Sequence, residues 1–306
     1  MQANANVFDR ITVLGEVLFD IFPDGSRVIG GAPFNVSCHL QGLGLDPVFV
    51  TRIGADDLGR EVLEQMAQWS MSLSGVQMDE QKPTGVVQVR FQNGEPYYEI
   101  QEDAAFDHIQ PWDWQVESTG KKGLLYHGTL AARGETTAQT IYSMASKSNQ
   151  EVFCDINLRD PWWSQELIQD VLTWCRYLKV NLQELHQVAE ILGLQGSETV
   201  EVARMVQEEA DLECLVLTLG ADGAMLFPRD REYLFSPAPQ VRDFKDAVGA
   251  GDAFSAVILL GLSRNWSWER VIQRAVFAAA QVCAIQGAVP ISHEFYQAMR
   301  QAWINM

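Results

Sequence analysis

Short apolar runs of strand type alternate with helical stretches along most of the 306-residue chain. Such alternation is typical of βαβ units, which build a mainly parallel sheet covered by helices. No repeat and no low-complexity linker divides the chain, so we expect a single α/β domain over residues 1–306. We predict strands over residues 10–14, 48–53, 123–127, 151–155, 177–181 and 214–219. We predict helices near residues 33–41, 58–68, 136–147, 165–177, 184–192, 200–209, 251–262 and 268–286.

Two segments, at about residues 16–31 and 72–109, interrupt this alternation with short strands of period-two patterning. Asn93-Gly94 between the runs 86–91 and 96–100 is a strong hairpin signal, because both residues accept the positive φ of a tight turn. A small antiparallel sheet inserted into a parallel α/β domain indicates a lid. The alternative is a simple extension of the edge of the main sheet.

Composition restricts the partners of the chain. An apolar share of 47% with 20% charged residues is typical of a globular protein. The net charge of −18, from 22 basic and 40 acidic residues, argues against a nucleic-acid partner. The five cysteines are scattered and form no C-x-x-C pair, which indicates reduced core residues. No signal peptide and no apolar run of membrane-spanning length is visible, so we expect a cytoplasmic protein with no membrane partner.

The segment with the most chemical information is Gly249-Ala250-Gly251-Asp252, which an apolar run over residues 253–262 follows. Glycine lets the backbone approach a ligand where a Cβ would clash. If the apolar run is a helix, the amides of Gly249, Ala250 and Gly251 lie at its N-terminus, where unpaired N–H groups attract an anion such as phosphate. Asp252 would then lie beside that anion, as a general base acting on a hydroxyl. The alternative is an acidic helix cap.

The stretch Asp246-Ala247-Val248-Gly249-Ala250-Gly251-Asp252 resembles the C-terminal signature of the PfkB, or ribokinase-like, family of sugar and nucleoside kinases. Ala247 stands where the family usually has Thr. Further segments match family motifs in family order, namely residues 13–20, 30–36, 53–59, 155–159, 181–184 and 218–223. The G-G-A-P-F-N and D-x-N-x-R segments are most similar to the fructokinase branch.

This resemblance implies a ribokinase-like three-layer α/β/α fold with a mainly parallel sheet and a small antiparallel β lid. The lid would be built from the inserts at residues 16–31 and 72–109. In the family, that sheet covers the sugar and often serves as a dimer face. We therefore expect a homodimer that forms through the lid, with a small-molecule sugar and ATP as ligands.

The expected sugar site combines hydroxyl-binding and cationic side chains. Asp20 follows an apolar strand, and ligands of α/β sheets bind beyond the carboxyl ends of strands. An acid there accepts from sugar hydroxyls, although Asp20 could instead belong to the turn before Pro23. Two arginines could supply positive charge, Arg90 from the lid and Arg159 from the end of the strand predicted over residues 151–155. The expected substrate-binding residues are Asp20, Gly30, Gly31, Asn35, Arg90 and Arg159.

The expected nucleotide site rests on two family motifs. Asn181 and Glu184 match N-x-x-E, and the family uses this acid to organise Mg²⁺ through water; the same pair is also a common helix cap. Thr218, Gly220 and Gly223 resemble the strand–turn–strand that holds the nucleotide. We expect Mg²⁺ with ATP as the cofactor.

A K⁺ site is implied by the family next to the glycine turn. Its candidate ligands are Asp246, Val248 and Gly287. Ala247 lacks the usual Thr hydroxyl, so the sequence leaves K⁺ dependence undecided.

These residues predict an ATP-dependent sugar kinase that phosphorylates a primary hydroxyl, with fructose to fructose 6-phosphate as the specific hypothesis. The chain lacks the G-x-x-x-x-G-K-[ST] pattern, which argues against a P-loop kinase. A 2-keto-3-deoxygluconate kinase, or another sugar or nucleoside kinase of the family, is the nearest alternative. An inactive sugar-binding regulator on the same fold is the alternative from a different class.

Overall fold

A large, mainly parallel sheet forms the centre of the molecule. The computed structural model describes residues 7–92, 95–111, 122–147, 149–304 and 306. Within them the strand order is β13-β12-β11-β10-β9-β8-β1-β4-β5, and only the pairs β11–β12 and β12–β13 are antiparallel. The strands are β1 (Phe8–Leu14), β4 (Val48–Gly54), β5 (Val76–Asp79), β8 (Lys122–His127), β9 (Gln150–Asp155), β10 (Tyr177–Asn181), β11 (Cys214–Thr218), β12 (Ala224–Pro228) and β13 (Leu234–Ser236).

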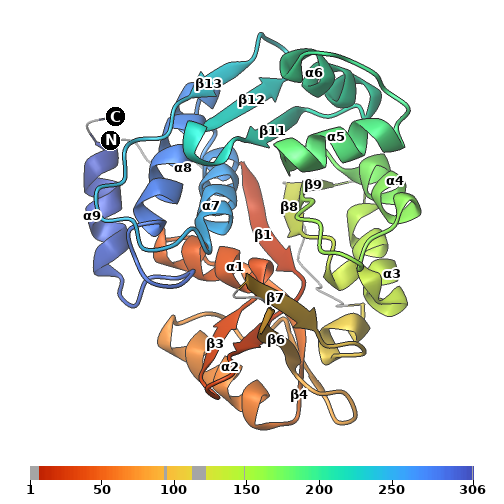
Figure 1. Cartoon of the computed structure of the whole chain (residues 1–306), viewed down its shortest axis with the longest axis vertical. Coiled ribbons are helices and arrows are strands. Elements are labelled where there is room, and N and C mark those ends of the chain that lie inside the picture. The colour runs from red at the N-terminus through yellow and green to blue at the C-terminus, as the bar shows by residue number, and fades with distance from the viewer. Residues whose placement is uncertain (1–6, 93–94, 112–121, 148, 305) are drawn as a thin grey trace.

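Helices cover both faces of this sheet, which gives the predicted three layers (Figure 1). One face is covered by four helices from the two ends of the chain, at the left in Figure 1. They are α1 (Ala32–Gly42), α7 (Ala250–Ser263), α8 (Trp268–Val282) and α9 (Glu294–Trp303). The opposite side carries α3 (Glu135–Ala145), α4 (Gln165–Trp174), α5 (Leu182–Ile191) and α6 (Thr199–Glu209). The helix α2 (Asp57–Gln68) lies at the end of the molecule where the smaller sheet is found.

Side chains alternate between the two faces of the sheet. On β8, Leu124 and Tyr126 join the core beneath α1, α7 and α8, whereas Leu125 joins the core beneath α3. All three are fully buried, so the central strands are apolar on both faces, as parallel strands covered by helices must be. This arrangement explains why continuous apolar runs marked these strands in the sequence.

A four-stranded sheet with the order β3-β2-β6-β7 lies beyond the end of β1 (Figure 1). Its strands are β2 (Leu18–Ile21), β3 (Arg27–Gly30), β6 (Gly85–Gln92) and β7 (Glu95–Ile100). All four lie within the two predicted inserts, and β6 and β7 form an antiparallel pair. The predicted Asn93-Gly94 turn lies outside the described residues. The strand β5 also falls in the second insert, but it pairs with β4 and extends the edge of the large sheet.

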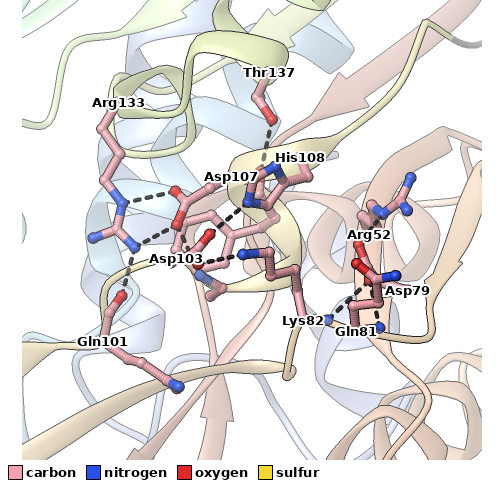
Figure 2. A network of polar contacts seen from close by, with 12 residues as sticks. Arg52, Asp79, Gln81, Lys82, Gln101, Asp103, Asp107, His108, Arg133 and Thr137 are labelled. Atoms are coloured by element: carbon pink, nitrogen blue, oxygen red, sulfur yellow. Dashed lines mark hydrogen bonds and ion pairs between the residues drawn. The ribbon is translucent and has the colours of Figure 1, made fainter.

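A polar network joins the base of the smaller sheet to the rest of the molecule (Figure 2). Arg133 donates to both carboxylate oxygens of Asp107, at 2.7 and 2.9 Å, and to the Gln101 carbonyl. Its guanidinium carbon also lies 4.3 Å from the ring centroid of Trp162. Because the Arg133 and Asp107 side chains are each only 7% exposed, this buried ion pair fixes the chain that follows β7 against the segment after β8.

Two predicted helices extend too far along the chain. The helix predicted over residues 165–177 ends at Trp174, because Cys175 is extended and leads into β10. The helix predicted over residues 268–286 ends at Val282, and the chain then turns so that the Gly287 amide reaches Asp246. The sequence did not reveal β13 or α9, and it assigned the segment that contains β5 to the smaller sheet rather than to the edge of the large one. Among the described residues, no helix has the length and apolar character needed to cross a membrane.

Candidate active site

The candidate site residues gather at the carboxyl ends of the parallel strands, next to the smaller sheet. Glu16 follows β1, Asp155 ends β9, Asn181 ends β10 and Thr218 ends β11. In Figure 1 the arrowhead of β1 points toward the smaller sheet, so these ends share one edge of the large sheet. Ligands of open α/β sheets bind at this edge.

The glycine turn forms at the N-terminus of α7, as predicted. Gly249 is the N-cap residue with φ 76°, and a Cβ there would lie 2.4 Å from the Ala288 Cα. Only glycine fits such a contact and such a backbone angle. Of the three amides predicted to bind an anion, that of Ala250 donates to the Ala247 carbonyl at 3.2 Å. Among the described residues, the amide of Gly251 has no backbone partner, and Gly251 is exposed.

Asp252 lies in the first turn of α7 and accepts a 2.8 Å hydrogen bond from the Asn35 side-chain amide. The pKa of the Asp252 carboxyl is raised to about 6, mainly by burial and in smaller part by the charge of the neighbouring Asp155. The Asn35 hydrogen bond and the positive charges of Lys179 and Arg159 oppose this rise. A carboxylate with a pKa near 6 is mostly ionised at neutral pH and is more basic than an exposed one.

A buried ion pair, which the sequence reasoning did not identify, lies directly beneath the turn. Lys179 Nζ contacts the two carboxylate oxygens of Asp155 at 2.8 and 2.7 Å, and both residues are buried. A Cβ on Gly251 would lie 3.5 Å from Lys179 Nζ. Ser255 Oγ lies 3.0 Å from both an Asp155 oxygen and the Gly251 carbonyl. This network therefore supports the turn and places a positive charge behind it. A lysine inside the apolar strand Tyr177–Asn181 was the available signal.

Glu16 is a second residue that sequence reasoning missed. Its side chain is buried, with a relative exposure of 4%, and its Oε2 has no hydrogen-bond partner among the described residues. Burial raises the pKa of Glu16 to about 7, and the charge of Asp252 contributes to this rise. Arg159 and the Ala32 amide act in the opposite direction. Glu16 therefore lies in the same electrostatic environment as the predicted base.

Asp20 and the Gly30-Gly31 pair lie together next to Glu16. A Cβ on Gly30 would lie 3.6 Å from an Asp20 carboxylate oxygen. Gly31 has φ 104°, and a Cβ there would lie 2.7 Å from the Glu16 carbonyl oxygen. The backbone angle and the close contact each require glycine at this position. Partial burial raises the pKa of Asp20, and Arg159 lowers it.

Arg159 is exposed but faces this group of acids, since its charge lowers the pKa values of Glu16, Asp20 and Asp252. The neighbouring Asp160, which is a possible ion-pair partner for Arg159 by its position in the sequence, accepts a hydrogen bond from the Trp163 indole at 2.7 Å. The predicted sugar-site residues are thus linked in a chain of neighbours: Gly30 lies beside Asp20, Gly31 lies beside Glu16 and Asn35 contacts Asp252, while the charge of Arg159 acts on all three acids.

Arg90 does not join this group, which corrects the sequence-based assignment. In the register of the smaller sheet Asp20 lies opposite Val87, and residues three apart on a strand point to opposite faces. Arg90 therefore lies on the other face of the sheet from Asp20. There its Nε lies 3.0 Å from a carboxylate oxygen of Glu99, and its side chain is 56% exposed.

The predicted nucleotide residues lie at the ends of β10 and β11. Asn181 and Glu184 form a capping box at the start of α5, in which each side chain accepts from the other residue's amide. The second Glu184 oxygen accepts from the Leu158 amide at 2.9 Å. The carboxylate is therefore fixed next to the segment that carries Arg159. Thr218, Gly220 and Gly223 form the turn between β11 and β12, where both glycines have positive φ.

The predicted monovalent-cation residues also lie together. Asp246 accepts from the Val248 amide at 2.8 Å and from the Gly287 amide at 3.3 Å. The loop after α8 is thus tied to the segment that leads into the glycine turn. Among the described residues, no group of three or more His, Cys, Asp or Glu side chains could hold a metal ion by itself.

A glycine turn at a helix N-terminus, with a carboxylate of raised pKa beside it, is the arrangement of an α/β phosphotransferase that acts on small molecules. The family model of the pfkB family carbohydrate kinases matches residues 14–294. The chain therefore belongs to this family of carbohydrate kinases.

Two curated relatives illustrate the range of this family. The fructokinase of Klebsiella pneumoniae is 28% identical over 289 residues, which cover 90% of this chain and 91% of the relative. The aminoimidazole riboside kinase of Salmonella typhimurium is 25% identical over 289 residues, with 90% and 88% covered.

Solved structures support the fold. A fructokinase of Xylella fastidiosa with bound ATP matches with a TM-score of 0.83 and 19% identity, covering 96% of this chain and 98% of that one. The fructokinase of Vibrio cholerae in a fructose-, ADP- and calcium-bound form matches with a TM-score of 0.76 and 23% identity, covering 95% and 99%. An uncharacterised sugar kinase of Pyrococcus horikoshii in complex with ATP matches with a TM-score of 0.77 and 22% identity, covering 91% and 93%.

Proposed function

We propose that this kinase transfers the γ-phosphoryl group of ATP to a primary hydroxyl of a neutral sugar, with fructose to fructose 6-phosphate as the specific reaction. The observation that carries the proposal is the Asn35–Asp252 hydrogen bond of 2.8 Å at the N-terminus of α7. This bond supports the proposal because it joins a predicted hydroxyl-binding residue to a carboxylate of raised pKa next to the glycine turn. A fructokinase at 28% identity across nine-tenths of both chains supports the choice of sugar.

In this proposal Asp252 takes the proton of the attacking hydroxyl. The sugar oxygen forms the new bond to the γ-phosphorus, the bond from that phosphorus to the bridging oxygen breaks, and ADP leaves. Charge spreads over the transferred group, and free amides at the turn are suited to bind it. The Gly251 amide fits this role better than that of Ala250, which donates to Ala247.

Lys179 adds a positive charge behind the turn. Its Nζ is held by Asp155 and lies close to Gly251, so it stabilises negative charge there through a buried region of low dielectric. We assign Lys179 a supporting electrostatic role in the transfer, together with Arg159.

Mg²⁺ bound with ATP would neutralise phosphate charge. Glu184 fits a water-mediated role, since its two oxygens are already oriented by the amides of Asn181 and Leu158. Mg²⁺ keeps several water ligands, and a fixed acid can bind those waters. Thr218, Gly220 and Gly223 would contact the nucleotide.

The charges of the proposed sugar site favour an uncharged substrate. The site contains the acids Asp20, Glu16 and Asp252, and Arg159 is a cation that acts on all three. A substrate carboxylate would compete with these acids for Arg159, and a buried unpaired charge costs several kcal/mol. This charge balance favours fructose over 2-keto-3-deoxygluconate.

A panel of hexoses, pentoses, nucleosides and keto-acids in an ADP-release assay tests the proposal. We expect fructose to give the highest kcat/KM and Asp20→Ala to raise its KM sharply. Arg90→Ala is the matched control, because Arg90 lies on the opposite face of the smaller sheet and its loss should leave that KM unchanged. Higher kcat/KM for 2-keto-3-deoxygluconate would overturn the choice of sugar, and release of no ADP with any compound would support the inactive regulator.

A further inference from the structure

A buried histidine lies on the same helix as Asn35, one turn further along. His39 is 1% exposed, and its Nε2 lies 3.0 Å from the Ala288 carbonyl oxygen. Its Nδ1 lies 2.8 Å from the Tyr296 hydroxyl, and Tyr296 is fully buried in α9. No part of the phosphoryl-transfer scheme above uses this pair.

The partners define the proton positions. A carbonyl oxygen only accepts, so His39 Nε2 must carry a proton and donate to Ala288. Burial lowers the pKa of His39 to about 4, so the ring is neutral at physiological pH and Nδ1 accepts from the Tyr296 hydroxyl. Tyr296 therefore fixes the tautomer in which His39 holds Ala288.

The glycine turn packs against the backbone of Ala288. A Cβ on Gly249 would meet the Ala288 Cα at 2.4 Å and its carbonyl oxygen at 2.5 Å, so these two backbone segments are in close contact. The adjacent Gly287 amide donates to Asp246, which leads into the same turn. A shift of Ala288 would therefore move the turn from two sides.

We propose that His39, oriented by Tyr296, is a positioning residue of the phosphoryl-transfer site: by holding the Ala288 carbonyl it fixes the Gly249–Gly251 turn. Helix α1 then positions both parts of the site, the base through Asn35 and the turn through His39. This inference rests on the proposed function only for the kinetic measurements. The exchange measurements test the contact between His39 and the turn whether or not the protein is active.

The test combines hydrogen–deuterium exchange with steady-state kinetics. In His39→Leu we expect exchange of the hydrogen-bonded amides of Val248, Ala250 and Ala253 to rise at least about tenfold, because the loss of a fixed contact increases local opening. Exchange in α2 should stay unchanged. We also expect kcat to fall at least about tenfold while the KM values for sugar and ATP change less than about threefold, the pattern of an interaction used in the transition state.

Two further variants separate positioning from stability. His39→Gln retains an amide donor for Ala288 and should restore most of the loss, and Tyr296→Phe should give an intermediate effect. Met66→Ala is the control, since this buried methionine of α2 belongs to the same core and its loss also lowers stability. Normal exchange at the amides of Val248, Ala250 and Ala253 together with normal kcat in folded His39→Leu would overturn the inference, as would an equal fall of kcat in Met66→Ala. Faster exchange in His39→Leu with no kinase activity in the unmodified protein would contradict the proposed function alone.

Discussion

Asn35 and Asp252 lie 217 positions apart in the sequence, yet the Asn35 amide donates to the Asp252 carboxylate at 2.8 Å. The bond joins the N-terminal part of α1 to the first turn of α7, and these two helices pack against each other. Because Asn35 is buried and donates to the ionised form, it limits the rise of the Asp252 pKa that burial causes. The proposed base is thereby kept ionised near neutral pH.

Replacement of Asp252 by Asn keeps the shape of the side chain and removes its basicity. We expect kcat to fall at least about 10²-fold, within the range that general bases supply. Binding of ATP and sugar, measured by calorimetry, should persist. Near-normal turnover by Asp252→Asn would show that another group accepts the proton.

The activity should depend on pH through the Asp252 carboxyl. As the proposed base, Asp252 acts in its ionised form, and its pKa is about 6, so kcat/KM should fall as pH decreases through about 6. Asn35→Leu removes a hydrogen bond that lowers this pKa, so the acidic limb should move to higher pH. A pH–rate profile of both proteins measures the shift, and a limb that stays in place would contradict the coupling.

Variants of the buried Lys179–Asp155 pair can separate its effect on the stability of the protein from the effect of the Lys179 charge on kcat. Lys179→Met leaves the Asp155 carboxylate buried without its cation, which should cost about 3–5 kcal/mol of unfolding free energy. The double variant Lys179→Met with Asp155→Leu removes both charges and should recover most of that stability. We expect kcat of the double variant to remain at least about tenfold below normal, because the positive charge behind the turn is missing. Chemical denaturation and turnover of the two variants give both quantities, and full activity of the double variant would exclude the electrostatic role.

Glu16 should make the protein less stable as the pH rises. Its pKa is raised from 4.5 to about 7 on folding, so the folded state binds a proton that the unfolded state has lost. Stability is therefore lost as pH rises from 4.5 through 7, by on the order of 3 kcal/mol. Glu16→Gln lacks this titration and should gain stability relative to the unmodified protein at pH 8 but not at pH 4.5. Thermal unfolding of both proteins at the two pH values tests this, and an equal difference at both would place Glu16 in a solvated environment.

The sequence predicted most of the large sheet, because buried parallel strands are continuous apolar runs. It also located the glycine turn and Asp252, since local spacing identifies a helix N-terminus. The sequence-based prediction was wrong for a residue whose side chain points to one or the other face of the smaller sheet according to how the strands are paired. Arg90 was assigned to the sugar site, but the pairing of β2 with β6 places it on the opposite face from Asp20.

The supporting residues of the site were harder to foresee. Glu16 and Lys179 were visible as charged residues at or within apolar strands, but only the packing of distant elements shows what faces them. The partnership of His39 with Tyr296 joins residues 257 positions apart, and no local pattern marks it. The end of α8 likewise depends on a distant contact, that of Gly287 with Asp246.

The loop around Asp246 supports a last prediction, that K⁺ activates the enzyme modestly. Asp246 accepts from the amides of Val248 and Gly287, so its carboxylate and the Val248 backbone lie at one place beside the glycine turn. Ala247 supplies no hydroxyl there, so we expect weaker activation than in relatives with Thr. Rates in K⁺ and in a bulky organic cation at equal ionic strength measure the effect. Because an ion that binds the folded state stabilises it, K⁺ should also raise the Tm, and Asp246→Ala should abolish both changes. Identical rates and identical Tm values in the two salts would show that K⁺ does not bind at Asp246.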